Sequence, residues 1–219
     1  MKSTLQQFLW NTTSPKLYFA ARYQWWRFSY SMLRRITARF KHQPPRLRAF
    51  PRDRNMLYER LRNISTHAPT ELCEVMTRHG SDKGAGWHNY TTLYSGLFDS
   101  MRDRSLRVFE LGLGTNHPEL RSTMGITGQP GASLRGWREF FPMASIFGAD
   151  IDRAILFESS RIRTFYCDQL DPAAIRDLWS EPSLMGGVDI LIEDGLHTFE
   201  ANSVFLENSL SQLREGGIY

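Results

Sequence analysis

Residues 106–114 read LRVFELGLG, and this stretch decides the expected fold. The apolar run up to Leu111 is typical of a strand buried inside a sheet, and Gly112-Leu113-Gly114 then predicts a tight turn. Further buried strands are expected after it, and helical patterns separate them. The chain therefore predicts an α/β fold with a doubly wound, mostly parallel sheet and right-handed connections.

The other predicted elements continue this alternation. Short apolar runs predict the strands, prolines mark helix boundaries, and Gly216-Gly217 is expected to open a further strand. Besides 106–111, the expected strands cover 146–150, 162–167 and 188–194, and the expected helices cover 133–141, 172–179 and 199–214.

Charge is distributed unevenly along the 219 residues, whose formal net charge is +4. Residues 1–54 contain twelve Lys and Arg residues and one acidic residue, whereas residues 55–219 contain fifteen basic and twenty-two acidic residues. The basic excess is therefore a property of the N-terminal segment, and no nucleic-acid binding is predicted for the body. Hydrophobic residues make up 41% of the chain, which excludes a wholly disordered protein.

We predict three regions along the chain. Residues 1–54 form a basic, aromatic-rich helical extension with a linker, residues 55–104 form a helical cap with a polar loop, and residues 105–219 form the ligand-binding domain. Within the extension, residues 15–40 have the pattern of an amphipathic helix. Its apolar stripe can pack on the body or on a second copy of the chain, as in a homo-oligomer, or can lie peripherally on an anionic membrane. Packing on the body or on a second copy is the commoner outcome for such a helix.

The cysteine content indicates the compartment. Cys73 and Cys167 are the only cysteines, too few for a disulfide scaffold or a zinc cluster. A reduced, cytoplasmic setting is expected, with attachment to the inner face of a membrane through the extension as an alternative. No run of the sequence approaches the roughly 18 apolar residues of a spanning helix.

Acidic side chains occur near the ends of four predicted strands. Glu110 lies near the end of the first, Asp150 ends the second, Asp168 follows the third, and Asp194 ends the fourth. Ligands of such sheets bind beyond the carboxyl ends of the strands. We therefore expect the four carboxylates to surround one hollow.

The glycine turn argues against a dinucleotide ligand. A dinucleotide site needs a third glycine and a helix that begins at once, but His117 takes the glycine position and the next predicted helix starts sixteen residues later. Asp150 lies 36 positions after Gly114, well beyond the usual spacing of about 20. An adenosyl ligand without a pyrophosphate fits better.

The motif order resembles that of class I S-adenosylmethionine-dependent methyltransferases, and more closely that of the macrolide sugar O-methyltransferases of the mycinamicin type. The resemblance implies a Rossmann-like fold and covers roughly residues 79–219. The residues that carry it are 81–84 with His88 and Tyr90, 110–114, 131–137 with Phe141-Pro142, 148–150, 168–169 and 194–197.

The resemblance implies a role for each matching residue. Asp194 would be the first carboxylate ligand of Mg²⁺, and His197 would be the general base that takes the proton of a sugar hydroxyl. The acceptor would be a small molecule or glycan, so the implied enzyme is a metal-assisted O-methyltransferase of a glycan or glycosylated natural product. The residues implied to bind S-adenosylmethionine are Glu110, Gly112 and Gly114 on its methionine and ribose side, Asp150 at the ribose, and Asp168 with Gln169 at the adenine.

Two alternatives stay open. Similar sequences include a group named after cephalosporin hydroxylase, which implies a different chemistry. The other alternative is a non-catalytic, methyltransferase-like protein that works through its basic extension at a membrane surface.

The sequence ends at Tyr219, where a fifth strand should begin, so we expect a fragment whose sheet is incomplete after the fourth to fifth strand. Residues 188–193 would then form a bare apolar edge unless another chain covers it. The metal site would have one carboxylate, which leaves the activity of the chain as given in doubt.

Overall fold

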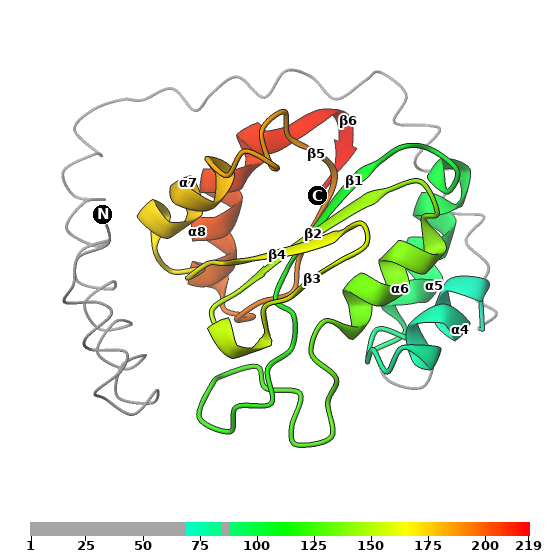
Figure 1. Cartoon of the computed structure of the whole chain (residues 1–219), viewed down its shortest axis with the longest axis horizontal. Coiled ribbons are helices and arrows are strands. Elements are labelled where there is room, and N and C mark those ends of the chain that lie inside the picture. Colours follow the sequence, from blue (N-terminus) through cyan, green and yellow to red (C-terminus); the bar gives the residue numbers. More distant parts are fainter. Residues whose placement is uncertain (1–68, 85–87) are drawn as a thin grey trace.

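The computed structural model describes residues 69–84 and 88–219, which contain a six-stranded sheet with helices on both faces (Figure 1). The sheet order is β3-β4-β2-β1-β5-β6. The β3–β4 pair is antiparallel and the other four pairs are parallel, so the predicted doubly wound, mostly parallel sheet is confirmed. The strands are β1 (Arg107–Leu111), β2 (Ser145–Asp150), β3 (Glu158–Ser159), β4 (Ile162–Tyr166), β5 (Val188–Glu193) and β6 (Leu213–Ile218).

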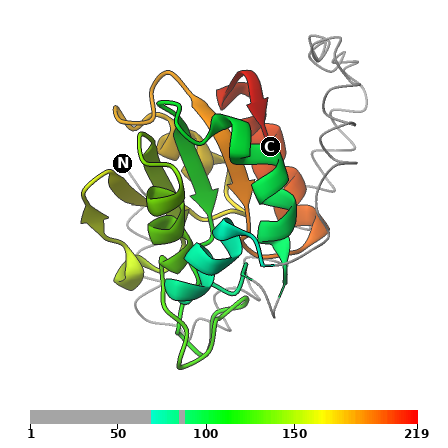
Figure 2. The ribbon, with the colours of Figure 1, turned by 90° about the vertical axis from the view of Figure 1, so that its right-hand side faces the viewer.

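The helices form two layers, as the two perpendicular views show (Figures 1 and 2). One layer contains α4, α5 and α6, and the other contains α7 and α8. Three short 3₁₀ helices, η1, η2 and η3, lie between the longer elements. The α-helices are α4 (Glu71–Arg78), α5 (Tyr90–Phe98), α6 (Ala132–Phe140), α7 (Pro172–Trp179) and α8 (Phe199–Ser209), and the 3₁₀ helices are η1 (Asp99–Met101), η2 (Arg153–Ile155) and η3 (Leu210–Gln212).

Strand β1 shows how the core is divided between the two faces of the sheet. Val108 packs in the same buried cluster as Trp137 of α6, while Phe109 packs with Trp179 of α7. Successive side chains of a strand point to opposite faces. Glu110 therefore points to the α6 face again, where its side chain has no exposed surface.

Helix α7 has the bounds that the sequence predicts. Asp171 caps it by accepting a hydrogen bond from the backbone N–H of Ala173 at 2.9 Å, and Pro172 occupies the first helical position. Both features favour a helix start at this position.

The segment after β5 differs from the prediction. The helix expected over 199–214 ends at Ser209, and β6 begins at Leu213, so Gly216-Gly217 lie inside the strand rather than in a turn before it. A register shift between β5 and β6, with Gly216 at φ +76°, accommodates the two glycines. The sequence suggested one long helix because leucine spacing continues through η3 into the strand.

Strand β6 pairs with β5, so the expectation of a bare apolar edge at 188–193 is wrong. Helix α5 was also missed, because the polar residues around His88 and Tyr90 indicated a loop. The predicted extension over 1–54, its helix at 15–40 and the cap residues 55–68 lie outside the described residues. Across 69–84 and 88–219, the helices lack the combined length and apolar character that crossing a bilayer requires.

Candidate functional site

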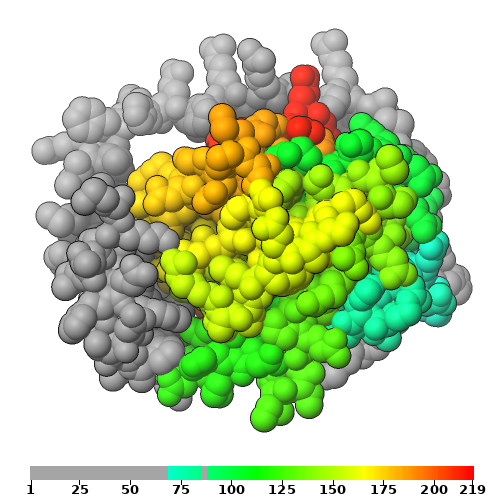
Figure 3. Space-filling view, viewed as in Figure 1, coloured from blue at the N-terminus to red at the C-terminus, as the bar shows by residue number. Residues whose placement is uncertain are grey.

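A cavity of about 560 Å³ opens at the carboxyl ends of β1, β2, β4 and β5. Part of its wall is the long loop between β1 and α6, which extends below the strands in Figure 1 and forms the green lower edge of Figure 3. Of the eight residues predicted for the site, Glu110 is not part of the lining. The predicted residues that do line the cavity are Gly112, Gly114, Asp150, Asp168, Gln169, Asp194 and His197.

The turns after β1 and β5 are in direct contact at the floor of this cavity. The N–H of Asp194 donates to the carbonyl of Leu111 at 2.9 Å. Gly112 has φ +91°, and a Cβ atom there would lie 2.1 Å from the carbonyl oxygen of Asp194. Only a glycine allows this approach, which explains the first glycine of the motif.

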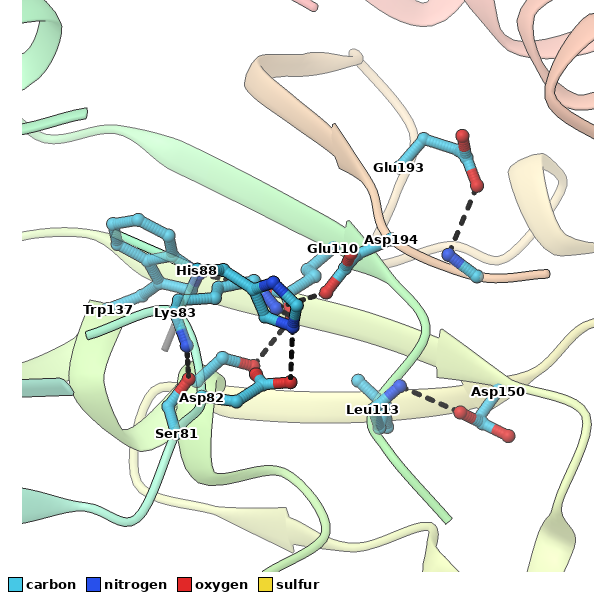
Figure 4. A network of polar contacts seen from close by, with 12 residues as sticks. Ser81, Asp82, Lys83, His88, Glu110, Leu113, Trp137, Asp150, Glu193 and Asp194 are labelled. Atoms are coloured by element: carbon cyan, nitrogen blue, oxygen red, sulfur yellow. Dashed lines mark hydrogen bonds and ion pairs between the residues drawn. The ribbon is translucent and has the colours of Figure 1, made fainter. Parts of the chain in front are cut away.

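Asp150 supports the glycine turn from the end of β2. Its carboxylate accepts hydrogen bonds from the N–H of Leu113 at 2.7 Å and the N–H of Asp152 at 2.8 Å, and Figure 4 shows the first of these. Burial raises the pKa of the Asp150 carboxyl above its ordinary value. Each carboxylate oxygen can accept a further hydrogen bond, so two adjacent hydroxyl groups can still bind here.

Asp168 and Gln169 follow β4, and both are buried. Asp168 accepts a hydrogen bond from the N–H of Leu170 at 3.0 Å. The side-chain amide of Gln169 reaches across to the turn after β5, where it contacts Glu193 and Leu196. Gln169 therefore connects the ends of two strands as well as lining the cavity.

A buried lysine joins the ends of β1 and β5. The Nζ of Lys83 lies 3.2 Å from Oε1 of Glu110 and donates a hydrogen bond to Oδ2 of Asp194, and its side chain is 5% exposed (Figure 4). Burial by itself lowers the pKa of Lys83, but the charges of Glu110 and Asp194 outweigh burial and raise it. Lys83 is therefore a permanent cation between the two carboxylates.

Glu110 lies beneath the cavity and is bound on three sides. Besides Lys83, the Oγ of Ser133 donates to it at 2.6 Å and the indole N–H of Trp137 donates at 2.5 Å. Burial raises the pKa of the Glu110 carboxyl, and the charge of Lys83 opposes that shift. Glu110 is therefore connected to the cavity through Lys83, which is part of the wall, and is not part of the wall itself.

Sequence reasoning gave no role to Lys83, although it lies in the Ser-Asp-Lys-Gly motif. Nothing local to a lysine in a polar loop indicates that it is buried. The shared motif was the one signal that could have identified it.

His197 and Asp194 form the corner of the cavity nearest α8. The Nε2 of His197 lies 3.6 Å from Oδ1 of Asp194, and the imidazole is 57% exposed. The backbone of His197 is left-handed, with φ +55°, which for a residue with a Cβ costs about 1–2 kcal/mol. His88 and Tyr90 line the same cavity with stacked rings 5.1 Å apart.

The donor atoms at this corner suit a hard cation only in part. Asp194 has one oxygen occupied by Lys83, and its other oxygen faces the His197 side. Magnesium ions are commonly held by one or two carboxylates and several waters. Within the part of the chain that the structure describes, no group of three or more His, Cys, Asp and Glu side chains could hold a metal. Asp194 could therefore supply one carboxylate ligand to such an ion.

The chain is similar in sequence to several sugar O-methyltransferases. It is 34% identical over 148 residues to 8-demethyl-8-alpha-L-rhamnosyl tetracenomycin-C 2'-O-methyltransferase of Streptomyces olivaceus, covering 68% of this chain and 36% of that enzyme. It is 33% identical over 155 residues to demethylmacrocin O-methyltransferase of Streptomyces fradiae, covering 70% and 36%. No protein-family model matches the chain.

The chain is also similar to solved structures of methyltransferases. The structure of the MycE methyltransferase of the mycinamycin biosynthetic pathway with Mg and SAH superimposes with a TM-score of 0.57 at 30% identity, over 69% of this chain and 39% of that one. A second structure, with Mg, SAH and mycinamycin VI, gives 0.56 at 28% identity, over 68% and 38%. The chain thus has a Rossmann-like methyltransferase fold and spans less than two fifths of the length of these relatives.

Proposed function

Because this chain is a homologue of the sugar O-methyltransferases of macrolide and tetracenomycin pathways, we propose that it forms the cofactor-binding part of an S-adenosylmethionine-dependent O-methyltransferase. The proposed acceptor is a sugar hydroxyl of a glycosylated natural product or glycan. The observation that carries the proposal is that seven of the eight site residues predicted from the sequence line one cavity at the carboxyl ends of the strands.

The cavity suits an adenosyl ligand in size and chemistry. Its volume of about 560 Å³ falls within the usual range for small-molecule sites, roughly 300–1,000 Å³. Asp150 offers carboxylate oxygens to the ribose, and the turn at Gly112 and Gly114 lets the ligand approach the backbone. Asp168 and Gln169 lie where the adenine is expected. S-adenosylmethionine supplies the methyl group, and its sulfur keeps the electron pair of the broken bond.

The other end of the cavity supplies the acid–base chemistry. Asp194 would supply one ligand to Mg²⁺, and the ion's chemistry there would be to lower the pKa of the acceptor hydroxyl. His197, exposed in the cavity, accepts the hydroxyl proton at a ring nitrogen. Lys83 holds one oxygen of Asp194, so the other stays directed towards the His197 side. Alignment of the acceptor oxygen with the methyl group can supply about 7–11 kcal/mol of the barrier.

The proposed setting is cytoplasmic. Cys73 and Cys167 are buried free thiols, which suits a reducing compartment. The alternatives of a hydroxylase-like or non-catalytic protein are not favoured, because the relatives are named methyltransferases and five of the six predicted cofactor-binding residues line the cavity. Contacts of residues 15–40 with a membrane or with a second copy of the chain stay predictions.

Calorimetry with S-adenosylhomocysteine tests the proposal. The chain should bind it, Asp150→Ala should weaken binding at least tenfold, and His197→Ala should leave binding within about threefold. Asp177→Ala on the far side of α7, remote from the cavity, is the matched control. Absence of binding by the unmodified chain would refute the cofactor assignment.

A further inference from the structure

We propose that Gln169 and Glu193 form a clamp that positions His197, and that this is the main role of Gln169. The proposal rests on the proposed function, because it takes His197 to be the base. Gln169 and Glu193 are positioning residues in this proposal, because they act on His197 through the turn over 193–197. This role differs from the contact with the adenine that the sequence suggests for Gln169.

The clamp consists of three hydrogen bonds to one short turn. The Nε2 of Gln169 donates to Oε1 of Glu193 at 2.7 Å. The same Glu193 oxygen accepts from the N–H of Gly195 at 3.1 Å, and Oε1 of Gln169 accepts from the N–H of Leu196 at 2.8 Å. Both ends of the Gln169 amide are therefore engaged with the turn.

The turn fits closely against the amide. A Cβ atom at Gly195 would lie 2.2 Å from Oε1 of Gln169. Gln169 is 7% exposed, so its amide has little room to move away from the turn. The position of Gly195 and Leu196 is consequently set by a side chain that belongs to another strand end.

His197 needs this support because its own contacts do not fix it. Its ring is 57% exposed, and its backbone is in the unfavourable left-handed region. Such a conformation persists only where the surroundings determine it. The two backbone N–H groups held by the clamp, those of Gly195 and Leu196, directly precede His197, so the clamp fixes the direction in which the imidazole leaves the chain.

An exchange of the two side chains tests the clamp. Gln169→Glu places two carboxylates against each other, and we expect the Gly195 and Leu196 amides to exchange hydrogen about tenfold faster and kcat to fall about 10- to 100-fold. The double variant Gln169→Glu/Glu193→Gln restores a donor–acceptor pair between the two side chains but turns an NH₂ group towards the Gly195 N–H, so kcat and the protection of Leu196, but not that of Gly195, should largely recover. Gly195→Ala, which displaces the amide from the opposite side, should resemble Gln169→Glu.

The affinity for S-adenosylhomocysteine separates the clamp from a role at the adenine. The clamp predicts that the Kd stays within about threefold in Gln169→Glu while kcat falls. If the Kd rises tenfold or more and kcat at saturating cofactor is unchanged, Gln169 acts on the adenine and the proposal is wrong. The proposal is also overturned if the double variant is no better than Gln169→Glu.

Two controls complete the design. The Asp194 amide, which donates to Leu111, should keep its protection in every variant. The pair Gln212→Glu and Glu207→Gln repeats the same chemical changes away from the cavity, at the half-buried end of η3 and on the exposed side of α8. If the unmodified chain neither binds the cofactor product nor turns over, the proposed function fails, and the exchange rates of Gly195 and Leu196 still decide whether the clamp exists.

Discussion

Lys83 and Glu110 carry opposite charges in a place where either charge alone would be costly. Their side chains are 5% and 0% exposed, and the Nζ and Oε1 atoms are 3.2 Å apart. Removing one partner of such a pair leaves the other as an unpaired buried charge, which destabilises more than loss of the whole pair. The pair therefore links the loop before α5 to β1, and any substitution there affects folding as well as the site.

We expect Lys83→Met to lower the free energy of unfolding by about 3–5 kcal/mol. Adding Glu110→Gln should recover part of this loss, because the side chain then carries no charge, while its amide oxygen can still accept from Trp137 and its NH₂ group can donate to the Oγ of Ser133. Urea unfolding of the two variants and of Glu110→Gln alone measures the coupling. A cost below about 1 kcal/mol for Lys83→Met would contradict the buried pair.

At the scale of elements, the contacts between α4, η1 and α6 are partly ionic. Arg102 donates to both carboxylate oxygens of Glu71, each at 2.5 Å, and its Nε donates to the carbonyl of Phe140 at 3.2 Å. The hydrogen bond from Arg102 lowers the pKa of Glu71. The group is largely exposed, so its contribution is expected to be small but dependent on pH.

A lowered pKa in the folded state means stability that is present above the ordinary pKa and is lost as the pH falls through the folded value. We therefore expect Glu71→Gln to cost up to about 1 kcal/mol at pH 7, and we expect this cost to decrease progressively as the pH falls below about 4.3, the ordinary pKa of a glutamate. Thermal unfolding of both proteins between pH 3 and pH 7 measures the difference. A difference that does not change with pH would exclude the ion pair as its cause.

The contact between the turns after β1 and β5 gives a second prediction for the elements. Gly112→Ala should destabilise by about 3–5 kcal/mol, since the new Cβ meets the backbone of Asp194 and the residue has a positive φ. Gly125→Ala is a matched control, because Gly125 has φ +73° with nothing within 4 Å of its Cβ position. The control should cost only about 1 kcal/mol. Equal costs would show that backbone strain alone is responsible.

For the molecule as a whole, ligand binding and stability are linked, because the cavity is built from four strand ends at once. Saturation with S-adenosylhomocysteine at about 100 times its Kd should stabilise the protein by about 2.7 kcal/mol. In a domain of this size that corresponds to a rise in Tm of roughly 5–11 °C. Differential scanning fluorimetry measures it, with adenosine monophosphate as the comparison ligand. No rise at any concentration would contradict binding in this cavity.

The sequence predicted the sheet and most of the cavity because both follow from local patterns. Apolar runs identify β1, β2, β4 and β5, and the rule that ligands bind beyond the carboxyl strand ends then groups Asp150, Asp168 and Asp194. Helix α7 was predicted to the residue because Asp171 and Pro172 mark its start.

What the sequence did not show depends on contacts between distant residues. The burial of Lys83 depends on Asp194, 111 positions away. The end of α8 is set by the pairing of β6 with β5, and the spacing of the leucines gives no indication of that pairing. Glu110 was predicted to contact the ligand, but the alternation of β1 directs it towards Trp137 on the α6 face.

The order of the strands has a consequence for synthesis of the chain on the ribosome. Strand β1 pairs on one side with β2, which follows soon after it, and on the other side with β5, which is made about eighty residues later. While the intervening residues are being translated, one edge of β1 has no neighbour. The helices α7 and α8 that cover the second face also emerge late. A nascent chain arrested before Val188 should therefore bind a chaperone such as trigger factor, and one released after α8 should not.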